Sequence, residues 1–150
     1  MLPSNLIDAR GPRFAATITT LVLASALLTQ SVWMLFAQTL VFAIGAGLGP
    51  NRSPYGLLFR NLVKPLLAPA TEFEEVKPPQ FAQLVGLLFG VVALAGAAFD
   101  VPAIFAGALS AALAAAFLNS VFGYCLGCEM YLLIKRVSIQ SKPIRAVVAR

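Results

Sequence analysis

The chain has 150 residues, enough for one compact domain, and a net charge of +5. Its residues are 59% hydrophobic and 11% charged, against about 45–50% and about 25% in soluble domains. A water-soluble fold of this size could not bury so much apolar surface, so we expect the lipid bilayer as solvent. The basic residues flank apolar runs, as membrane topology requires, which excludes a nucleic-acid partner.

The first apolar run predicts two helices. Residues 14–51 contain no charged side chain. One helix of that length would reach about 57 Å, and the hydrocarbon core is only about 30 Å thick. We therefore expect a turn near residues 29–31, the most polar point, between helices at about 13–29 and 32–49. Trp33 then lies beside the turn, where an amphipathic ring suits the membrane interface.

Residues 50–80 differ in composition from the runs around them. Ser53 and Pro54 are typical of a helix N-cap followed by proline at the first helical position. The sequence after them predicts an amphipathic interfacial helix at about 54–67, lying on the membrane. Its apolar stripe consists of Leu58, Leu62 and Leu66. The basic residues expected at the lipid headgroups are Arg52, Arg60 and Lys64. The acidic stretch that follows is expected to be a solvated loop.

The second half of the chain predicts two more helices, at about 80–98 and 102–122. Asp100 marks the turn between them. Gly86 and Gly90 form a G-x-x-x-G motif, which lets helix backbones approach closely, either within the chain or across a dimer. The sequence thus predicts an all-α polytopic membrane protein. It has four transmembrane helices, one interfacial helix between the second and third, and a cytoplasmic tail at residues 135–150.

The distribution of charge predicts the topology. In this arrangement every Lys and Arg lies on one side of the membrane, and the other side carries only Asp100. We expect the protein in the inner membrane, and the positive-inside rule then places both termini in the cytoplasm. A competing interpretation is a cleaved signal peptide. Arg10 and Arg13 would form its basic region and residues 24–26 its cleavage site, leaving three helices.

The only two cysteines form a Cys-x-x-Cys at the end of the fourth predicted helix. Thiol oxidoreductases use this spacing, because Cys125 and Cys128 at a helix start can close a small disulfide ring. Gly123 and Gly127 give the backbone freedom for that geometry. The sequence leaves open whether the helix breaks at Gly123. A break would place both sulfurs at a new helix N-terminus, where thiolate is favoured.

The neighbouring charges act in both directions. Lys135 and Arg136, one to two turns on, favour a thiolate, and the adjacent Glu129 opposes it. The cysteines can therefore be structural, a redox or sulfur-handling dithiol, or ligands of a metal shared across a dimer. A lasting disulfide is disfavoured on a reducing cytoplasmic side.

Other chemistry has little support in the sequence. Histidine is absent, which removes the commonest general base and metal ligand. No phosphate loop, carboxylate pair or Ser/His/Asp set is present, so we predict neither a cofactor nor a metal site. Uncharged polar residues in the helices, such as Gln38, are expected to hydrogen-bond between helices. The tyrosines are expected to be interfacial anchors: Tyr55, Tyr124 and Tyr131.

Four segments resemble a family of bacterial membrane proteins known as domain of unknown function 4395. They are Asp8–Phe14, Gly49–Gly56, Pro79–Ala82 and Phe122–Tyr131, and the resemblance covers about residues 8–135. The last segment contains Phe-Gly-x-Cys-x-Gly-Cys, the most specific of the four. Many members carry a further Cys-Pro near the N-terminus, where this chain has Leu2-Pro3. The resemblance implies the four-helix architecture and a sulfur or thioredoxin-type pathway.

The favoured function is a membrane-anchored dithiol. Cys125 or Cys128 would attack a disulfide or persulfide as thiolate, and the other would resolve the intermediate. A cytoplasmic thioredoxin- or rhodanese-like protein would be its partner. One alternative is a non-catalytic accessory or scaffold subunit of a larger membrane complex. Another is a channel for a small solute, which would require a homo-oligomer.

Overall fold

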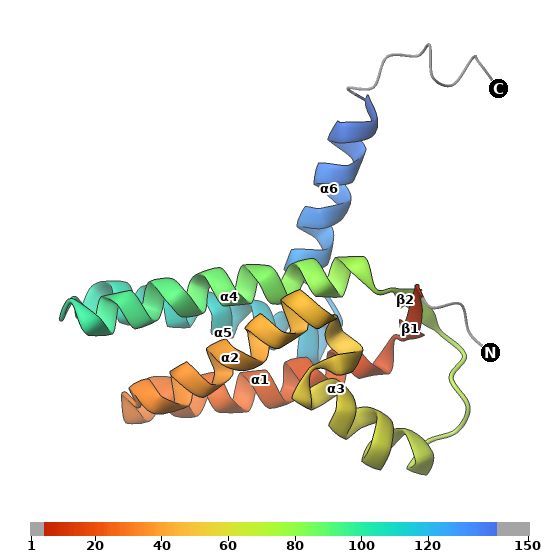
Figure 1. Cartoon of the computed structure of the whole chain (residues 1–150), viewed down its shortest axis with the longest axis horizontal. Helices are drawn as coiled ribbons and strands as arrows, with labels where there is room; N and C mark the ends of the chain where they lie inside the picture. The colour runs from red at the N-terminus through yellow and green to blue at the C-terminus, as the bar shows by residue number, and fades with distance from the viewer. Residues whose placement is uncertain (1–4, 141–150) are drawn as a thin grey trace.

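Four long helices lie side by side in a bundle (Figure 1). The structure is a computed structural model that describes residues 5–140. The bundle helices are α1 (Arg10–Thr29), α2 (Val32–Leu48), α4 (Lys77–Ala98) and α5 (Pro102–Phe122). They are arranged as a ring, in which α1 packs on α2, α2 on α4, α4 on α5, and α5 back on α1. The predicted helical class is confirmed.

The bundle has the dimensions and surface of a membrane protein. Three of its helices, α1, α4 and α5, are long and apolar enough to cross a membrane, and α2 is a shorter apolar helix of 17 residues. The 22 residues of α4 span about 33 Å, close to the thickness of a hydrocarbon core. Large apolar side chains point outward from it, with Leu88 59% exposed and Val91 52% exposed. Such a surface is stable in lipid rather than in water.

The helix ends follow local chemistry. The turn between α1 and α2 places Gln30 in the left-handed region (φ 54°), and the Ser31 hydroxyl accepts the N–H of Met34 as the N-cap of α2. The α4 helix begins at Lys77, three residues before the predicted start. Pro78 and Pro79 occupy its first turn, where the missing N–H groups would have had no partner in the helix.

Glycines in α4 permit its close contacts with α2. A Cβ atom at Gly90 would lie 2.5 Å from the Thr39 hydroxyl oxygen, and one at Gly86 would lie 2.9 Å from the Phe42 ring. The G-x-x-x-G motif is therefore used for packing within the chain.

The tightly packed core fills only one half of the bundle. Its most buried members, each at most 1% exposed, are Leu23, Ala26, Leu35, Ala93 and Leu109. All belong to the helix halves nearest the α1–α2 and α4–α5 turns. The other half of the bundle leaves a cavity, which is lined by alanines and glycines together with larger side chains such as Phe42 and Phe89 and is described below.

The segment between α2 and α4 is less regular than predicted. The expected helix at 54–67 consists of three short pieces: α3 (Pro54–Leu58), the π-helical η2 (Phe59–Val63) and the 3-10 helix η3 (Lys64–Leu66). A 3-10 turn, η1 (Pro50–Arg52), precedes them. Pro65 explains the change of winding, because it lacks the N–H that would continue an α-helix.

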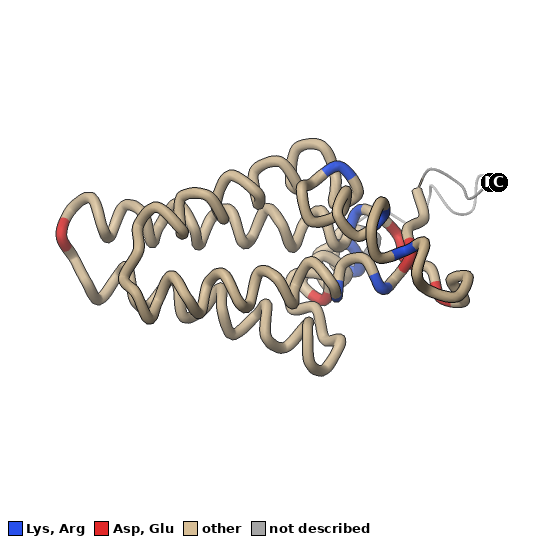
Figure 2. The backbone as a smooth tube through the Cα atoms, turned by 90° about the horizontal axis from the view of Figure 1, so that it is seen from below, with Lys and Arg blue, Asp and Glu red and all other residues tan. Residues whose placement is uncertain are grey.

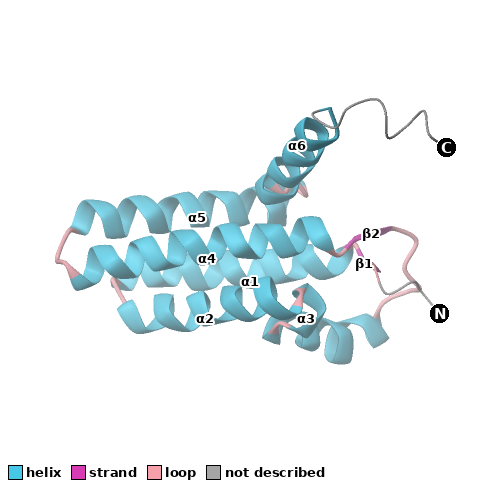
Figure 3. Cartoon of the chain, turned by 45° about the horizontal axis from the view of Figure 1, so that its top comes forward, coloured by secondary structure: helices cyan, strands magenta, loops and turns pink. Residues whose placement is uncertain are grey.

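The expected solvated acidic loop is partly a strand. β2 (Phe73–Glu75) pairs antiparallel with β1 (Leu6–Asp8), and Ile7 lies opposite Glu74 (Figure 3). Burial raises the pKa of the Glu74 carboxyl above its ordinary range. This small sheet ties the start of α1 to the start of α4.

The described charges are separated along the bundle. Lys and Arg gather at the end that carries α3 and the sheet, and the opposite end has one acidic position, in the α4–α5 turn (Figure 2). At the basic end a further helix, α6 (Leu126–Gln140), projects away across the bundle axis (Figure 1). The predicted tail at 135–150 is thus helical as far as Gln140, and its remainder lies outside the described residues.

Asp8 organises the start of α1, which gives a testable prediction. Its buried carboxylate accepts two hydrogen bonds from the Arg10 guanidinium, at 3.0 and 2.8 Å, and one from the Arg10 backbone N–H at 3.0 Å. The hydrogen bond from the Arg10 side chain lowers the pKa of Asp8 below 3.8, although burial opposes this. Asp8→Asn should lower the free energy of unfolding by about 2 kcal/mol at pH 7.

The pH dependence supplies the check. A lowered pKa means that the charged carboxylate stabilises the fold above about pH 4, and that this contribution is lost as the pH falls through the folded-state value. In thermal unfolding in detergent, the difference in stability between wild type and Asp8→Asn should therefore shrink as the pH falls into the acid range. A constant difference between the two down to pH 2 would contradict this role.

A polar chain crosses the basic half of the bundle. The Tyr55 hydroxyl donates to Gln38 Oε1 at 2.6 Å, and Gln38 Nε2 donates to the Thr19 hydroxyl at 3.4 Å. Gln38 is 1% exposed, so its amide depends on these partners. Tyr55 is therefore a hydrogen-bond donor to the bundle interior, not simply a surface anchor. Burial raises the pKa of its hydroxyl.

Removing the Tyr55 hydroxyl should have a measurable effect on stability. Tyr55→Phe leaves the Gln38 carbonyl buried without its donor, and should cost about 1 kcal/mol of stability. The melting temperature should fall by a few degrees. Tyr124→Phe is the control, because that side chain is 48% exposed. Equal effects of both changes would mean that the hydrogen bond adds nothing.

Candidate functional site

A break in the chain at Gly123 creates the site. The α5 helix ends at Phe122, and Gly123 adopts the left-handed conformation (φ 67°) that other residues adopt only with strain. Its N–H donates to the Asn119 carbonyl at 3.1 Å. After two more residues the chain restarts as α6 at Leu126. The question that the sequence left open is thus answered: the two cysteines lie at a new helix N-terminus.

Cys125 is the N-cap of α6. Its carbonyl accepts the N–H of Glu129 at 3.0 Å, the first bond of the helix, and its sulfur accepts the N–H of Cys128 at 3.2 Å. The two cysteines form a disulfide with their Cα atoms 5.1 Å apart. Both are partly buried. Once the bond is reduced, the helix N-terminus and the Cys128 N–H favour a thiolate at Cys125.

The first turn of α6 packs directly on α4. A Cβ atom at Gly127 would lie 2.5 Å from the Ala82 Cα, so this glycine provides close backbone contact rather than flexibility. The ring centroids of Phe81 and Tyr131 are 5.8 Å apart, so Tyr131 packs against α4. Cys128 lies one position after the glycine that contacts α4. Helical spacing places it on the same face as Lys135, seven residues later.

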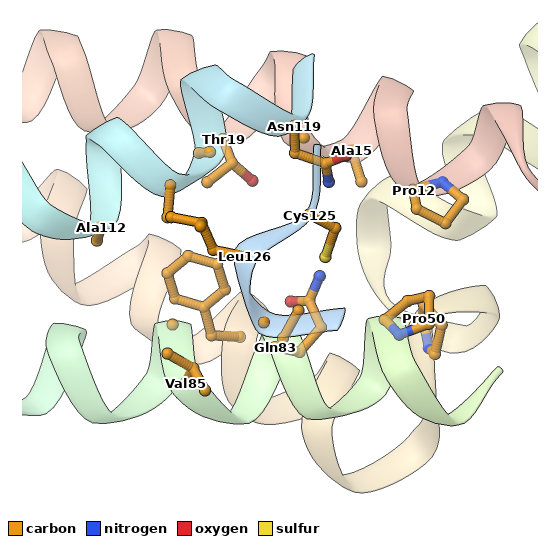
Figure 4. A pocket seen from close by; sticks show the side chains of 18 of the residues that line it. Pro12, Ala15, Thr19, Pro50, Gln83, Val85, Ala112, Asn119, Cys125 and Leu126 are labelled. Atoms are coloured by element: carbon orange, nitrogen blue, oxygen red, sulfur yellow. The ribbon is translucent and has the colours of Figure 1, made fainter. Parts of the chain in front are cut away.

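A cavity of about 330 Å³ lies inside the ring of helices beside the disulfide. One wall is formed by Cys125 and Leu126 (Figure 4) together with Gly127. The other walls come from α1, α2, α4 and α5, and at the basic end from β1, η1, α3 and η2. The α5 wall is made of alanines, at positions 111, 112, 115 and 116. Cys128 is not among the lining residues, so the two sulfurs have different surroundings.

Four uncharged polar residues line this mostly apolar cavity: Thr19, Asn51, Gln83 and Asn119. Within the described part of the chain, the Oε1 atom of Gln83 is a buried side-chain oxygen without a hydrogen-bond partner. Figure 4 shows the side chains of Gln83 and Cys125 pointing toward one another. An unpaired buried amide oxygen is costly unless a donor on a ligand or a water satisfies it.

The predicted supporting residues are only partly brought together. Glu129, Lys135 and Arg136 lie on the exposed part of α6. Arg52, Arg60 and Lys64 are exposed on the segment that contains α3, and do not line the cavity. Among residues 5–140 no group of three or more His, Cys, Asp or Glu side chains could hold a metal ion.

Three residues near the disulfide were missed by the sequence analysis as members of this site. Gln83 and Asn119 line the cavity, and the Arg13 guanidinium lies against Gly123, with its Nε atom 3.5 Å from where a Cβ would be. The available signal for the first two was their polarity within apolar helices. Arg13 is 110 residues away in sequence, and no local pattern connects it with the cysteines.

One of the comparisons with known proteins identifies a family. No curated protein and no solved structure matches the chain. The family described as "Domain of unknown function (DUF4395)" matches residues 7–136, which include all five long helices in whole or in large part, the cavity and both cysteines. The chain is therefore a member of the DUF4395 family.

Proposed function

We propose that this protein is a membrane-anchored dithiol that exchanges its Cys125–Cys128 disulfide with a partner protein. The observation that carries the proposal is the position of Cys125. It is the N-cap of α6, and its sulfur accepts the N–H of Cys128 at 3.2 Å. A thiolate released there is stabilised, and a stabilised thiolate is a good leaving group in disulfide exchange.

The different surroundings of the two sulfurs assign their roles. A partner thiolate attacks Cys128, because Cys125 lines the cavity inside the ring of helices and Cys128 does not. The Cys125–Cys128 bond breaks, a bond from the partner sulfur to Cys128 forms, and Cys125 leaves as thiolate. The second thiol of the partner then attacks the partner sulfur of the mixed disulfide, and Cys128 leaves as thiolate. The partner becomes a disulfide, and this chain holds the two electrons as a dithiol.

The α6 helix offers a docking face for that partner. Lys135 and Arg136 follow Cys128 by seven and eight residues, so they share its side of the helix. A cytoplasmic protein of thioredoxin-like fold with an acidic rim around its own cysteines fits this face. A rhodanese-like persulfide carrier would use the same contact with the reduced dithiol: the Cys128 thiolate attacks the outer sulfur of the persulfide, and the carrier's cysteine leaves as thiolate.

The proposed setting is the inner membrane, crossed four times by α1, α2, α4 and α5. The excess of Lys and Arg at one end supports a cytoplasmic location for that end and both termini. Because α6 lies across the bundle axis, it would rest in the plane of the membrane surface. Its apolar side chains Met130, Leu133 and Val137 recur at helical spacing and would face the lipid. The segment at 54–66 would lie on the same surface.

The test is thiol labelling in oriented vesicles. A charged, membrane-impermeant maleimide is applied to inverted and right-side-out vesicles, over a pH series and with or without reductant. We expect labelling only after reduction, only from the cytoplasmic face, and already fast near pH 7, below the range near 8.5 where a free cysteine ionises.

Cysteines that stay unreactive from both faces until the protein is denatured would overturn the proposal. They would be structural, and the protein would be better described as an accessory subunit of a membrane complex. Labelling from the opposite face would overturn the topology alone, because exchange with a partner on that side would remain possible.

A further inference from the structure

A groove on the outside of the bundle shares part of its wall with the cavity beside the disulfide. The groove runs between α4 and α5 and is lined by apolar side chains, among them Leu88, Val92 and Ile104. Val85, Phe89 and Met130 line both the cavity and the groove. In a membrane the groove would face the acyl chains. An occupant that entered from the lipid at these shared residues would have one end in the cavity and the other between the helices.

The volume and lining of the cavity restrict what the end of the occupant inside it can be. About 330 Å³ lies at the lower end of the range for small-molecule sites. The described lining residues include no Asp, Glu, Lys or Arg, which disfavours a charged headgroup such as that of a phospholipid. The unpaired Oε1 atom of Gln83 can only accept a hydrogen bond, so it requires a donor such as a hydroxyl. The amide nitrogen of the same side chain can donate to a carbonyl.

The remaining wall is redox-active, since it is formed by the sulfur of Cys125. A ligand that is apolar, lipid-soluble, uncharged, carbonyl-bearing and placed against a dithiol has the properties of a two-electron acceptor. We propose that the cavity holds the ring of an isoprenoid quinone, with its tail in the α4–α5 groove, and that this quinone reoxidises the Cys125–Cys128 dithiol. The proposal rests on the proposed exchange function and adds the terminal electron acceptor.

The electrons and protons balance. The dithiol loses two electrons and two protons as the sulfur–sulfur bond forms, and the quinone takes up both pairs to become a quinol. Gln83 would donate to a carbonyl oxygen of the quinone and accept from the corresponding hydroxyl of the quinol. Electrons then pass from the partner dithiol, through Cys128 and Cys125, to the membrane quinone pool.

The experiment uses the full-length protein, reduced and reconstituted in lipid nanodiscs without oxygen. Decylubiquinone is the probe, because its ring is fully substituted and has no unsubstituted carbon to which a thiol could add. Quinol is followed by ultraviolet absorbance, and protein thiols are followed by the mass added by a maleimide. We expect one quinol for each disulfide formed, at a rate that saturates with quinone concentration.

Two variants test the cavity itself. Ala115→Phe places a ring in the cavity, and Ala114→Phe, one residue away on the exposed side of α5, is its matched control. We expect Ala115→Phe to lower the rate at least tenfold and Ala114→Phe to leave it unchanged. Gln83→Leu, close in size, should raise the half-saturating quinone concentration at least fivefold. This variant keeps the test valid if Ala115→Phe does not fold.

The outcomes separate this proposal from the exchange function. Exchange with a thioredoxin, but quinone reduction that neither saturates nor responds to Ala115→Phe and Gln83→Leu, would overturn the quinone site alone. Saturable quinone reduction without thioredoxin exchange would overturn the proposed partner chemistry and leave the quinone site standing. If phospholipid were recovered from the cavity and decylubiquinone had no effect, the cavity would be a phospholipid-binding site and the proposal would be overturned.

Discussion

Cys125→Ser is expected to accumulate a mixed disulfide between Cys128 and a partner thiol, and to do so nearly quantitatively. Without Cys125 the remaining sulfur has no intramolecular resolving thiol, and a partner that lacks its own second cysteine cannot resolve the intermediate either, so the mixed disulfide persists. The partner is therefore a thioredoxin whose resolving cysteine is replaced by Ser and whose remaining cysteine carries a thionitrobenzoate disulfide. The Cys128 thiolate attacks the thioredoxin sulfur and thionitrobenzoate leaves. The measurement is gel mobility in the absence of reductant. Covalent complex should form with this variant and disappear on adding dithiothreitol.

The reciprocal variant is the control. Cys128→Ser keeps the cavity-lining sulfur and removes the accessible one, so we expect little complex and at least a hundredfold loss of exchange. If the two variants trapped the partner equally, the division of roles would be wrong. If both exchanged as fast as wild type, neither cysteine would be the reacting group.

Gly127→Ala should have the second largest effect. The added Cβ would lie 2.5 Å from the Ala82 Cα, and this atom belongs to the α4 backbone, which cannot rotate aside as a flexible side chain can. The α6 helix must therefore move off α4, at a cost of about 1–3 kcal/mol. Because α6 positions both sulfurs and one cavity wall, we expect exchange to slow at least tenfold.

Gly47→Ala provides the comparison, since nothing lies within 4 Å of a Cβ at that position. Replacing glycine by alanine within a helix should there be neutral or stabilising by up to about 1 kcal/mol. Thermal unfolding and exchange rate should be measured for both variants. A Gly127→Ala protein as active and stable as Gly47→Ala would show that close contact between α6 and α4 is unnecessary.

Much of the helical framework could be predicted from the distribution of charge alone. The absence of charge over residues 14–51, combined with the thickness of a bilayer, requires a turn, and the polar residues at 29–31 indicate where it lies. The short strands could not be predicted, because three residues carry too little periodicity. Their pairing depends on Leu6–Asp8 meeting Phe73–Glu75, a contact between segments far apart in sequence.

The candidate site was predictable only where its chemistry is local. The spacing of Cys125 and Cys128 indicates a dithiol, but whether Gly123 ends the helix depends on whether the chain can pack after the break. In the structure that packing is the contact of Gly127 with Ala82. Gln83 could not be assigned in advance either. A glutamine in an apolar helix usually bonds to a neighbouring helix, as Gln38 does, and only the structure distinguishes the two.

The alanine wall of α5 has a consequence for variation within the family. Ala112, Ala115 and Ala116 all line the cavity, and each sits on a helix whose backbone is already fixed by its neighbours. A larger residue at any of these positions would subtract volume without touching the cysteines or their turn. Selection among occupants of different size could then proceed by single substitutions on one helix, while the sulfur chemistry at the other wall stayed constant.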